Sequence, residues 1–195
     1  MTPPGRPRSV EADRAILDAA IVLLHEEGYS RMSMEAVAEA AGVGKTTIYR
    51  RYRDKADLVT AAIASMPGMA DLPDTGSTQA DLAELVRVFA RSKERIQNMR
   101  LIGTLWAEEQ RNPDLVKLFR ERVIVPRRKL MLAVLRRGQE RGEVREDIDP
   151  DLVTEMMVGA HFARQFSGRS FPRDWADQVV ETIWPALESR TTSSA

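Results

Sequence analysis

The spacing of apolar residues constrains the fold of this chain more than any other feature. Between Val10 and Glu27, apolar residues fall at positions i, i+4, i+7 and i+8, which places Ile16, Ala20, Leu23 and Leu24 on one face of a helix. Nowhere in the 195 residues do apolar and polar side chains alternate as they do in a half-buried strand. The sequence therefore predicts an all-α fold.

Capping and turn-forming residues divide the apolar pattern into separate helices. Gly28 should end the first helix, Ser33 is placed to cap a second, and Asp54 to cap a later one. The run PGMADLPDTGSTQ then concentrates Pro, Gly, Asp and Ser, as connectors do. We expect a domain boundary at its start, which gives domains over residues 1–66 and 67–195.

Beyond the connector, helical spacing continues to the C-terminal region. Pro126 and Pro185 fall inside two of the predicted segments and should kink or break them. The predicted helices cover residues 80–97, 99–111, 114–141, 150–168 and 172–188.

Composition argues against several classes of protein. The chain has no Cys and two His, so we expect neither a disulfide framework nor a metal site, and no cofactor. No nucleophile motif and no pair of catalytic carboxylates stands out, so we do not expect an enzyme. No apolar run approaches the roughly 18 residues of a membrane span, and the N-terminus lacks the apolar core of a signal peptide. We therefore expect a cytoplasmic protein without a membrane partner.

The segment GVGKTT, residues 42–47, has the ending of a phosphate-binding loop. Such a loop needs a further glycine at position 39, where this chain has Glu39, and it follows a buried strand. The preceding MEAVAEAA is alanine-rich and favours a helix instead. The sequence therefore argues against a nucleotide site.

A helix-turn-helix accounts for the same residues. Ala38 is small enough for two helices to cross closely, Gly42 tolerates the positive φ of a tight turn, and Ile48 can join the core beneath. The segment from Val43 to Lys55 also carries five basic residues against one acidic residue. A solvated helix face would explain the charge alone, but its coincidence with the turn favours DNA phosphate as the partner.

Residues 29–58 resemble the helix-turn-helix of the tetracycline-repressor (TetR) family of transcriptional regulators. The matching features are Ser33, Val37-Ala38, Ala41-Gly42-Val43, Thr47, Tyr49, Tyr52, Lys55 and Leu58. Residues 140–162 resemble the family's C-terminal domain more loosely. The resemblance implies a three-helix DNA-binding domain with a fourth connecting helix, then a helical domain for ligand binding and dimerisation.

Candidate DNA contacts follow from side-chain chemistry and from this resemblance together. Basic and threonine side chains can read base edges, and hydroxyl or ammonium groups can hold phosphates in register. The candidate base readers are Lys45, Thr46, Arg50 and Arg51, and the candidate phosphate contacts are Ser33, Thr47, Tyr49 and Lys55. Arg51 could instead contact phosphate, and Tyr49 could instead pack. Arg6 and Arg8 belong to a basic arm over residues 1–9 that we expect to be disordered and able to reach a groove.

Two further sets of residues are assigned in the C-terminal domain. An apolar seam on its last two helices predicts a two-fold dimer, as the resemblance also implies, through Leu152, Met156, Gly159, Ala160, Ala163, Val180 and Trp184. The resemblance also implies an effector pocket, and large, soft side chains could line it for a mostly apolar ligand, although a core position is the better account of any single one: Phe89, Met99, Ile102, Trp106, Phe119, Met131, Met157, His161 and Phe162.

The sequence thus predicts a DNA-binding regulator. The first hypothesis is a repressor that a small apolar ligand releases from a palindromic operator. The alternative is a helix-turn-helix regulator that a protein partner controls, with no small-molecule inducer.

Overall fold

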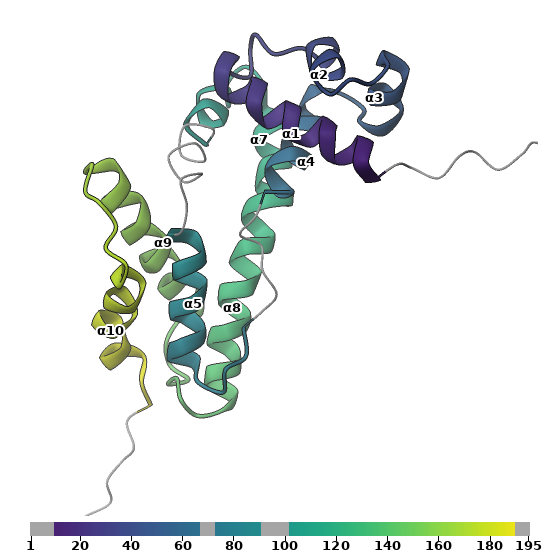
Figure 1. Cartoon of the computed structure of the whole chain (residues 1–195). Helices are drawn as coiled ribbons and strands as arrows, with labels where there is room; N and C mark the ends of the chain where they lie inside the picture. Colours follow the sequence, from purple (N-terminus) through teal and green to yellow (C-terminus); the bar gives the residue numbers. More distant parts are fainter. Residues whose placement is uncertain (1–9, 67–72, 91–101, 190–195) are drawn as a thin grey trace, which may run out of the picture. The chain divides into compact units, whose positions relative to one another are not determined.

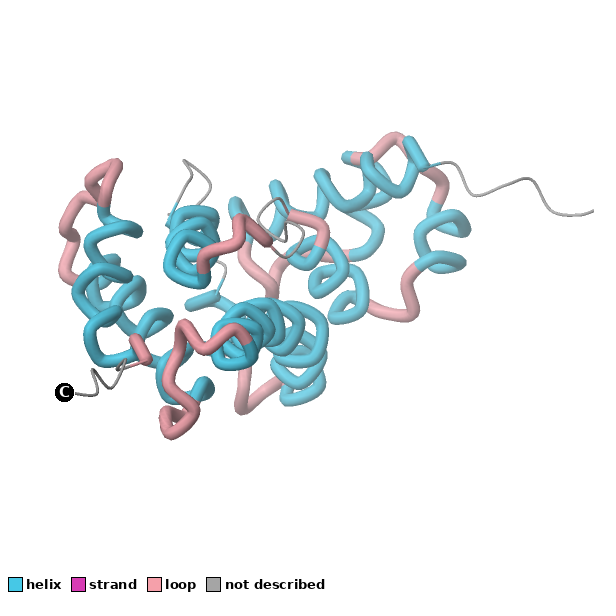
Figure 2. The backbone as a smooth tube through the Cα atoms, turned by 90° about the horizontal axis from the view of Figure 1, so that it is seen from below, coloured by secondary structure: helices cyan, strands magenta, loops and turns pink. Residues whose placement is uncertain are grey.

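The computed structural model describes residues 10–66, 73–90 and 102–189 of the chain (Figure 1). Over these ranges the backbone is helical and forms no β-strand beyond an isolated bridge between Val144 and Glu188 (Figure 2). The predicted all-α class is therefore confirmed. None of the described helices is long and apolar enough to cross a bilayer.

The chain divides into two compact units. The first contains residues 10–66 and 102–125 of the described chain, and the second contains residues 73–90 and 126–189. The expected boundary after Met66 is also a boundary between the units. Residues 102–125, which the sequence assigned to the C-terminal domain, instead fold with the N-terminal helices.

The first unit is built from short helices around one apolar core. Its helices are α1 (Val10–Glu27), α2 (Met34–Ala40), α3 (Lys45–Arg51), α4 (Lys55–Ala64), α7 (Pro113–Phe119) and the π-helix η1 (Arg120–Ile124), and residues 102–107 are also helical (Figure 1). Helix α1 packs against α2 and α4, and α4 packs against α7 and η1.

The predicted capping residues take up their expected places in this unit. Gly28 has a φ of 78° immediately after α1. The Ser33 hydroxyl accepts a hydrogen bond of 3.1 Å from the N–H of Ala36, and the Asp54 carboxylate accepts one of 2.7 Å from the N–H of Asp57. Each cap satisfies an N–H group that the first turn of a helix leaves without an internal acceptor.

Apolar residues from all of these helices meet in the core of the first unit. Ile16, Ala20 and Leu24 of α1 are buried, as their spacing predicted, whereas Leu23 is only partly buried against the same core. Ile48 of α3 and Leu58 of α4 are completely enclosed. Burying each large aliphatic side chain contributes about 1.5–3 kcal/mol. This core holds α3, a helix of seven residues, in a fixed orientation.

The second unit contains α5 (Thr78–Ala90), α8 (Val125–Glu140), α9 (Pro150–Phe166) and α10 (Trp175–Leu187) (Figure 1). Helix α10 packs against α5. Gly138 of α8 faces Thr78, and a Cβ atom at position 138 would lie 2.6 Å from the Thr78 Cγ2 atom. Only glycine allows α5 and α8 to come this close at that point.

Pro126 was expected to kink or break its segment, but helical structure continues through it to Glu140. Proline removes an N–H donor and crowds the carbonyl four residues earlier. The π-helix η1 lies directly before it, and the N–H of Val125 bonds to the carbonyl of Arg120, five residues back. The wider π turn is the local adjustment with which the helix accommodates the proline. Pro185 also lies inside a helix, but α10 ends two residues later, at Leu187.

Candidate nucleic-acid interface

Helices α2 and α3 are joined by the tight turn that the sequence predicted. Gly42 has a φ of 65°, and the N–H of Val43 reaches back to the carbonyl of Ala38 with a bond of 2.9 Å. Ala38 and Ile48 are buried between the two helices and α1. The helix-turn-helix is therefore present with its small crossing residue, its glycine turn and its apolar underside.

One face of α3 is open to solvent. Lys45, Thr46, Tyr49 and Arg50 are exposed along it, while Ile48 points into the core. The helix contains no acidic residue. Such a surface offers cationic and hydroxyl donors to a polyanion, and Thr47 lies half-buried at its edge.

Arg51 lies on the opposite side of α3. Its side chain is 6% exposed and forms an ion pair with Asp13 of α1. A guanidinium held in this way secures α3 to α1 and is turned away from the exposed face. This placement argues against the base-reading role expected for Arg51.

Lys55, at the first position of α4, is engaged with the loop between α1 and α2. Its ammonium donates to the carbonyls of Tyr29 at 2.7 Å and Met32 at 3.0 Å, and it lies 4.4 Å from the centre of the Tyr29 ring. Desolvation lowers the pKa of Lys55, with the charge of Glu108 acting in the opposite direction. These contacts give Lys55 a structural role, and its predicted contact with phosphate stays a prediction.

Glu108, which the sequence did not single out, also holds this loop through a hydrogen bond. The Ser30 hydroxyl donates to the Glu108 carboxylate, and the Asn112 side chain donates to its other oxygen at 2.6 Å. Hydrogen bonding from Ser30 is the main reason why the pKa of Glu108 is lowered. The loop that leads into the helix-turn-helix is therefore fixed from two directions.

Tyr49 connects the two helices of the DNA-binding pair. Its hydroxyl donates to the Glu35 carboxylate of α2 at 2.9 Å, which lowers the pKa of Glu35 and raises the pKa of Tyr49. Tyr49 is 48% exposed, so both its contact with phosphate and its partly buried packing role stay predictions. Ser33 accepts the capping bond from Ala36 and can still donate its own hydroxyl hydrogen.

Asp57 and Arg122 form a partly buried ion pair that no sequence pattern indicated. The Arg122 guanidinium, on η1, lies 2.6 Å from the Asp57 carboxylate and donates to the Thr60 hydroxyl at 3.1 Å. Burial alone would raise the pKa of Asp57, but hydrogen bonds from the Arg53 N–H and from Arg122 lower it below its ordinary value. This pair connects the start of α4 to η1.

The residues assigned to an effector pocket divide between the two units. Phe119 is in the core of the first unit with Ile102 packed against it, whereas Met131 and Met157 are in the core of the second. Trp106 is 43% exposed and meets Phe119 edge to face. His161 and Phe162 are half-buried in the second unit, and Met99 and the Phe89 side chain lie outside the described residues. The pocket stays a prediction.

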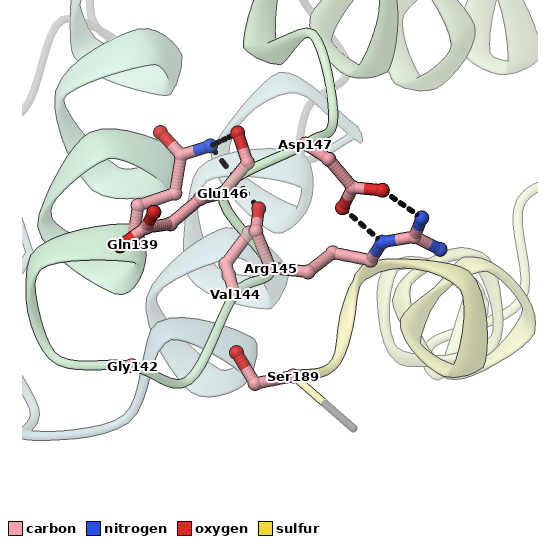
Figure 3. A pocket seen from close by; sticks show the side chains of 7 residues that line it. All are labelled: Gln139, Gly142, Val144, Arg145, Glu146, Asp147 and Ser189. Atoms are coloured by element: carbon pink, nitrogen blue, oxygen red, sulfur yellow. Dashed lines mark hydrogen bonds and ion pairs between the residues drawn. The ribbon is translucent and has the colours of Figure 1, made fainter. Parts of the chain in front are cut away.

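A polar pocket of about 560 Å³ opens in the second unit (Figure 3). Its lining includes Arg145, whose Nε donates to the Asp147 carboxylate at 2.5 Å, and Gln139, whose amide donates to the Arg145 carbonyl at 3.2 Å. These groups already satisfy one another, and the pocket does not match the apolar site that was expected.

The residues assigned to a dimer interface also fall into two groups. Leu152 and Met156 of α9 are 54% and 57% exposed, and Gly159 and Ala163 are exposed beside them. Ala160 and Trp184 are partly buried against the core of their own unit. The assignment of Val180 to the interface must be corrected, because Val180 is 1% exposed within that core and has no surface to offer a second subunit.

The basic arm that was expected to reach a groove, with Arg6 and Arg8, lies outside the described residues.

Comparisons with known proteins agree with this geometry. Residues 16–62 match the model for bacterial regulatory proteins of the tetR family, and residues 72–183 match the model for the tetracyclin repressor-like C-terminal domain. The uncharacterized HTH-type transcriptional regulator YdeS of Bacillus subtilis is 32% identical over 164 residues, which cover 82% of this chain and 81% of YdeS.

Solved structures share the fold. The TetR family transcription regulator SCO0332 superposes with a TM-score of 0.68 at 27% identity, over 91% of this chain and 98% of that one. The flavonoid-responsive regulator FrrA superposes with a TM-score of 0.66 at 23% identity, over 94% of this chain and all of that one. With its helix-turn-helix, this chain is a DNA-binding transcriptional regulator, and it belongs to the TetR family.

Proposed function

We propose that this protein is a repressor that binds a palindromic operator as a homodimer and leaves it when a small, mostly apolar ligand binds. The observation that carries the proposal is the exposed, acid-free face of α3. Lys45 and Arg50 can each bond guanine O6 and N7 in the major groove, and the Thr46 methyl group can pack on thymine.

The exposed apolar side of α9 supports the homodimer. Leu152, Met156 and Phe166 present large apolar side chains to solvent, and Gly159 and Ala163 are small enough for a second helix to approach closely. TetR-family regulators usually act as dimers. A two-fold dimer presents two copies of α3, which matches two half-sites about one DNA turn apart.

Ligand control draws support from a regulator of the same fold. FrrA is named as flavonoid-responsive, and it shares this fold. A ligand can release DNA only if it binds the DNA-incompetent state more tightly than the DNA-bound state. A hundredfold release corresponds to about 2.7 kcal/mol of coupling.

Selection of bound sequences from a random DNA pool tests the operator. We expect a palindrome with half-site centres about 10 base pairs apart. An asymmetric site, or recovery of unselected DNA, would contradict the proposal.

Thermal unfolding of the purified chain with a panel of lipophilic compounds tests ligand control. We expect at least one compound to raise the melting temperature and to release the selected operator. If none does both, control by a protein partner becomes the better account.

A further inference from the structure

Arg127 lies on the buried face of α8. The buried residues of that helix are Met131, Val134, Leu135 and Gly138, and their spacing from position 127 places Arg127 on the same face. Its Nε atom is enclosed, and within the described parts of the chain it has no hydrogen-bond partner. Burial lowers the pKa of this guanidinium. A charged group in such a position is unfavourable until something pairs with it.

The other cationic residues of α8 are differently placed. Arg128 is bonded to Asp151 through its Nε at 2.9 Å, and Arg137 to Asp81 at 2.7 Å. Lys129 and Arg136 are exposed to water. Arg127 is thus a half-buried cation of α8 for which no ion pair with a carboxylate of the described residues is present.

The surroundings favour an amphipathic partner. Met131, one turn after Arg127, belongs to an apolar cluster with Met157 and Trp175, and Leu130 packs against the same cluster. A guanidinium stays charged at any physiological pH, and its planar fork suits the two oxygens of a carboxylate or phosphate. An apolar body against the half-buried Leu130 and an anionic group at Arg127 would satisfy both features.

We propose that Arg127 binds the anionic group, a carboxylate or a phosphate, of an otherwise apolar effector. The inference rests on the proposed ligand control and deepens it, because it adds an anionic group to a ligand that was expected to be mostly apolar. Arg127 would then act as the residue that selects acids over neutral molecules of the same shape.

Thermal unfolding of the full-length chain with octanoate, octyl phosphate and 1-octanol, at matched ionic strength, tests the assignment. We expect at least one of the two anions to raise the melting temperature at lower concentration than the alcohol. The better anion distinguishes carboxylate from phosphate. Equal effects of acid and alcohol, or no effect of either anion, would overturn it.

Arg127→Met keeps an unbranched, flexible side chain, shorter than that of arginine, and removes its charge. The variant should need roughly 10- to 100-fold more of the anion for the same shift, with the response to octanol unchanged. It should melt at the same temperature as the parent or higher without ligand, because an uncompensated charge has been removed. Arg136→Met, on the exposed side of α8, is the matched control and should behave as the parent does.

A carboxylate of this chain is the competing occupant, for example Glu94, which lies outside the described residues. In that case Arg127→Met and Glu94→Gln would each lower the melting temperature without ligand, and the proposal would be wrong. Release of the selected operator separates the two hypotheses. If neutral compounds release the operator and anions do not, ligand control is supported, and the proposal that Arg127 binds an anionic group is wrong. If no compound releases it, ligand control itself fails.

Discussion

Arg50 and Arg51 are neighbours in sequence with different surroundings, because a helix turns by about 100° per residue. Arg50 is exposed on α3, whereas Arg51 is 6% exposed and paired with Asp13. We expect Arg50→Ala to weaken binding to the selected operator by roughly 1–3 kcal/mol and to leave the melting temperature unchanged. Equal losses on operator and random DNA would show that Arg50 does not read a base.

Arg51→Ala should act on stability instead. Removing the guanidinium leaves the partly exposed Asp13 without its partner, so the free energy of unfolding should fall by about 1–3 kcal/mol. Denaturant unfolding measures this change, and Asp13→Asn is the matched variant. If the two substitutions together cost no less than the sum of the single changes, the pair does not act as a unit.

Lys55 could stabilise the fold or contact DNA phosphate, and a substitution can distinguish the two roles. If its ammonium mainly holds the carbonyls of Tyr29 and Met32, Lys55→Ala should lower the melting temperature and barely change the salt dependence of DNA binding. If it contacts phosphate, the slope of log affinity against log salt should become shallower by about one unit, as for any lost phosphate contact. Measuring both quantities on one variant decides between the roles. From the geometry, we expect the stability loss.

At the scale of elements, the ion pair between Asp57 and Arg122 connects α4 to η1. The folded-state pKa of Asp57 is below its unfolded value, so this contribution to stability is complete above the unfolded pKa. It is lost as the pH falls through the folded pKa. Asp57→Asn should therefore flatten the loss of unfolding free energy as the pH falls below about 4. An unchanged acid profile would show that other carboxylates dominate it.

At the scale of the whole molecule, the exposed side of α9 predicts the assembly. Met156→Glu places a charge in the centre of this apolar stripe and should give a monomer by light scattering at micromolar concentration. The monomer should lose affinity for the palindrome, because one recognition helix replaces two. Val22→Glu changes a similarly exposed residue of α1 and is the control. A dimer that survives Met156→Glu would place the interface elsewhere.

Local chemistry alone determined most of the helical elements. The bounds of α1 and α3, the caps at Ser33 and Asp54 and the turn at Gly42 follow from residues within a few positions of one another. Backbone dihedral preferences and first-turn hydrogen bonds act over this range, so the sequence expresses them directly. The same local features carried the family assignment.

Tertiary structure alone decided which partners the polar side chains found. Arg51 meets Asp13, Lys55 meets the carbonyls after α1, and Val180 lies in a core and not at an interface. Residues 102–125 join the first unit for the same reason, because their apolar side chains are buried with those of the N-terminal helices. Helical periodicity gives the face on which a residue lies, but the element that covers that face is fixed only when distant segments come together.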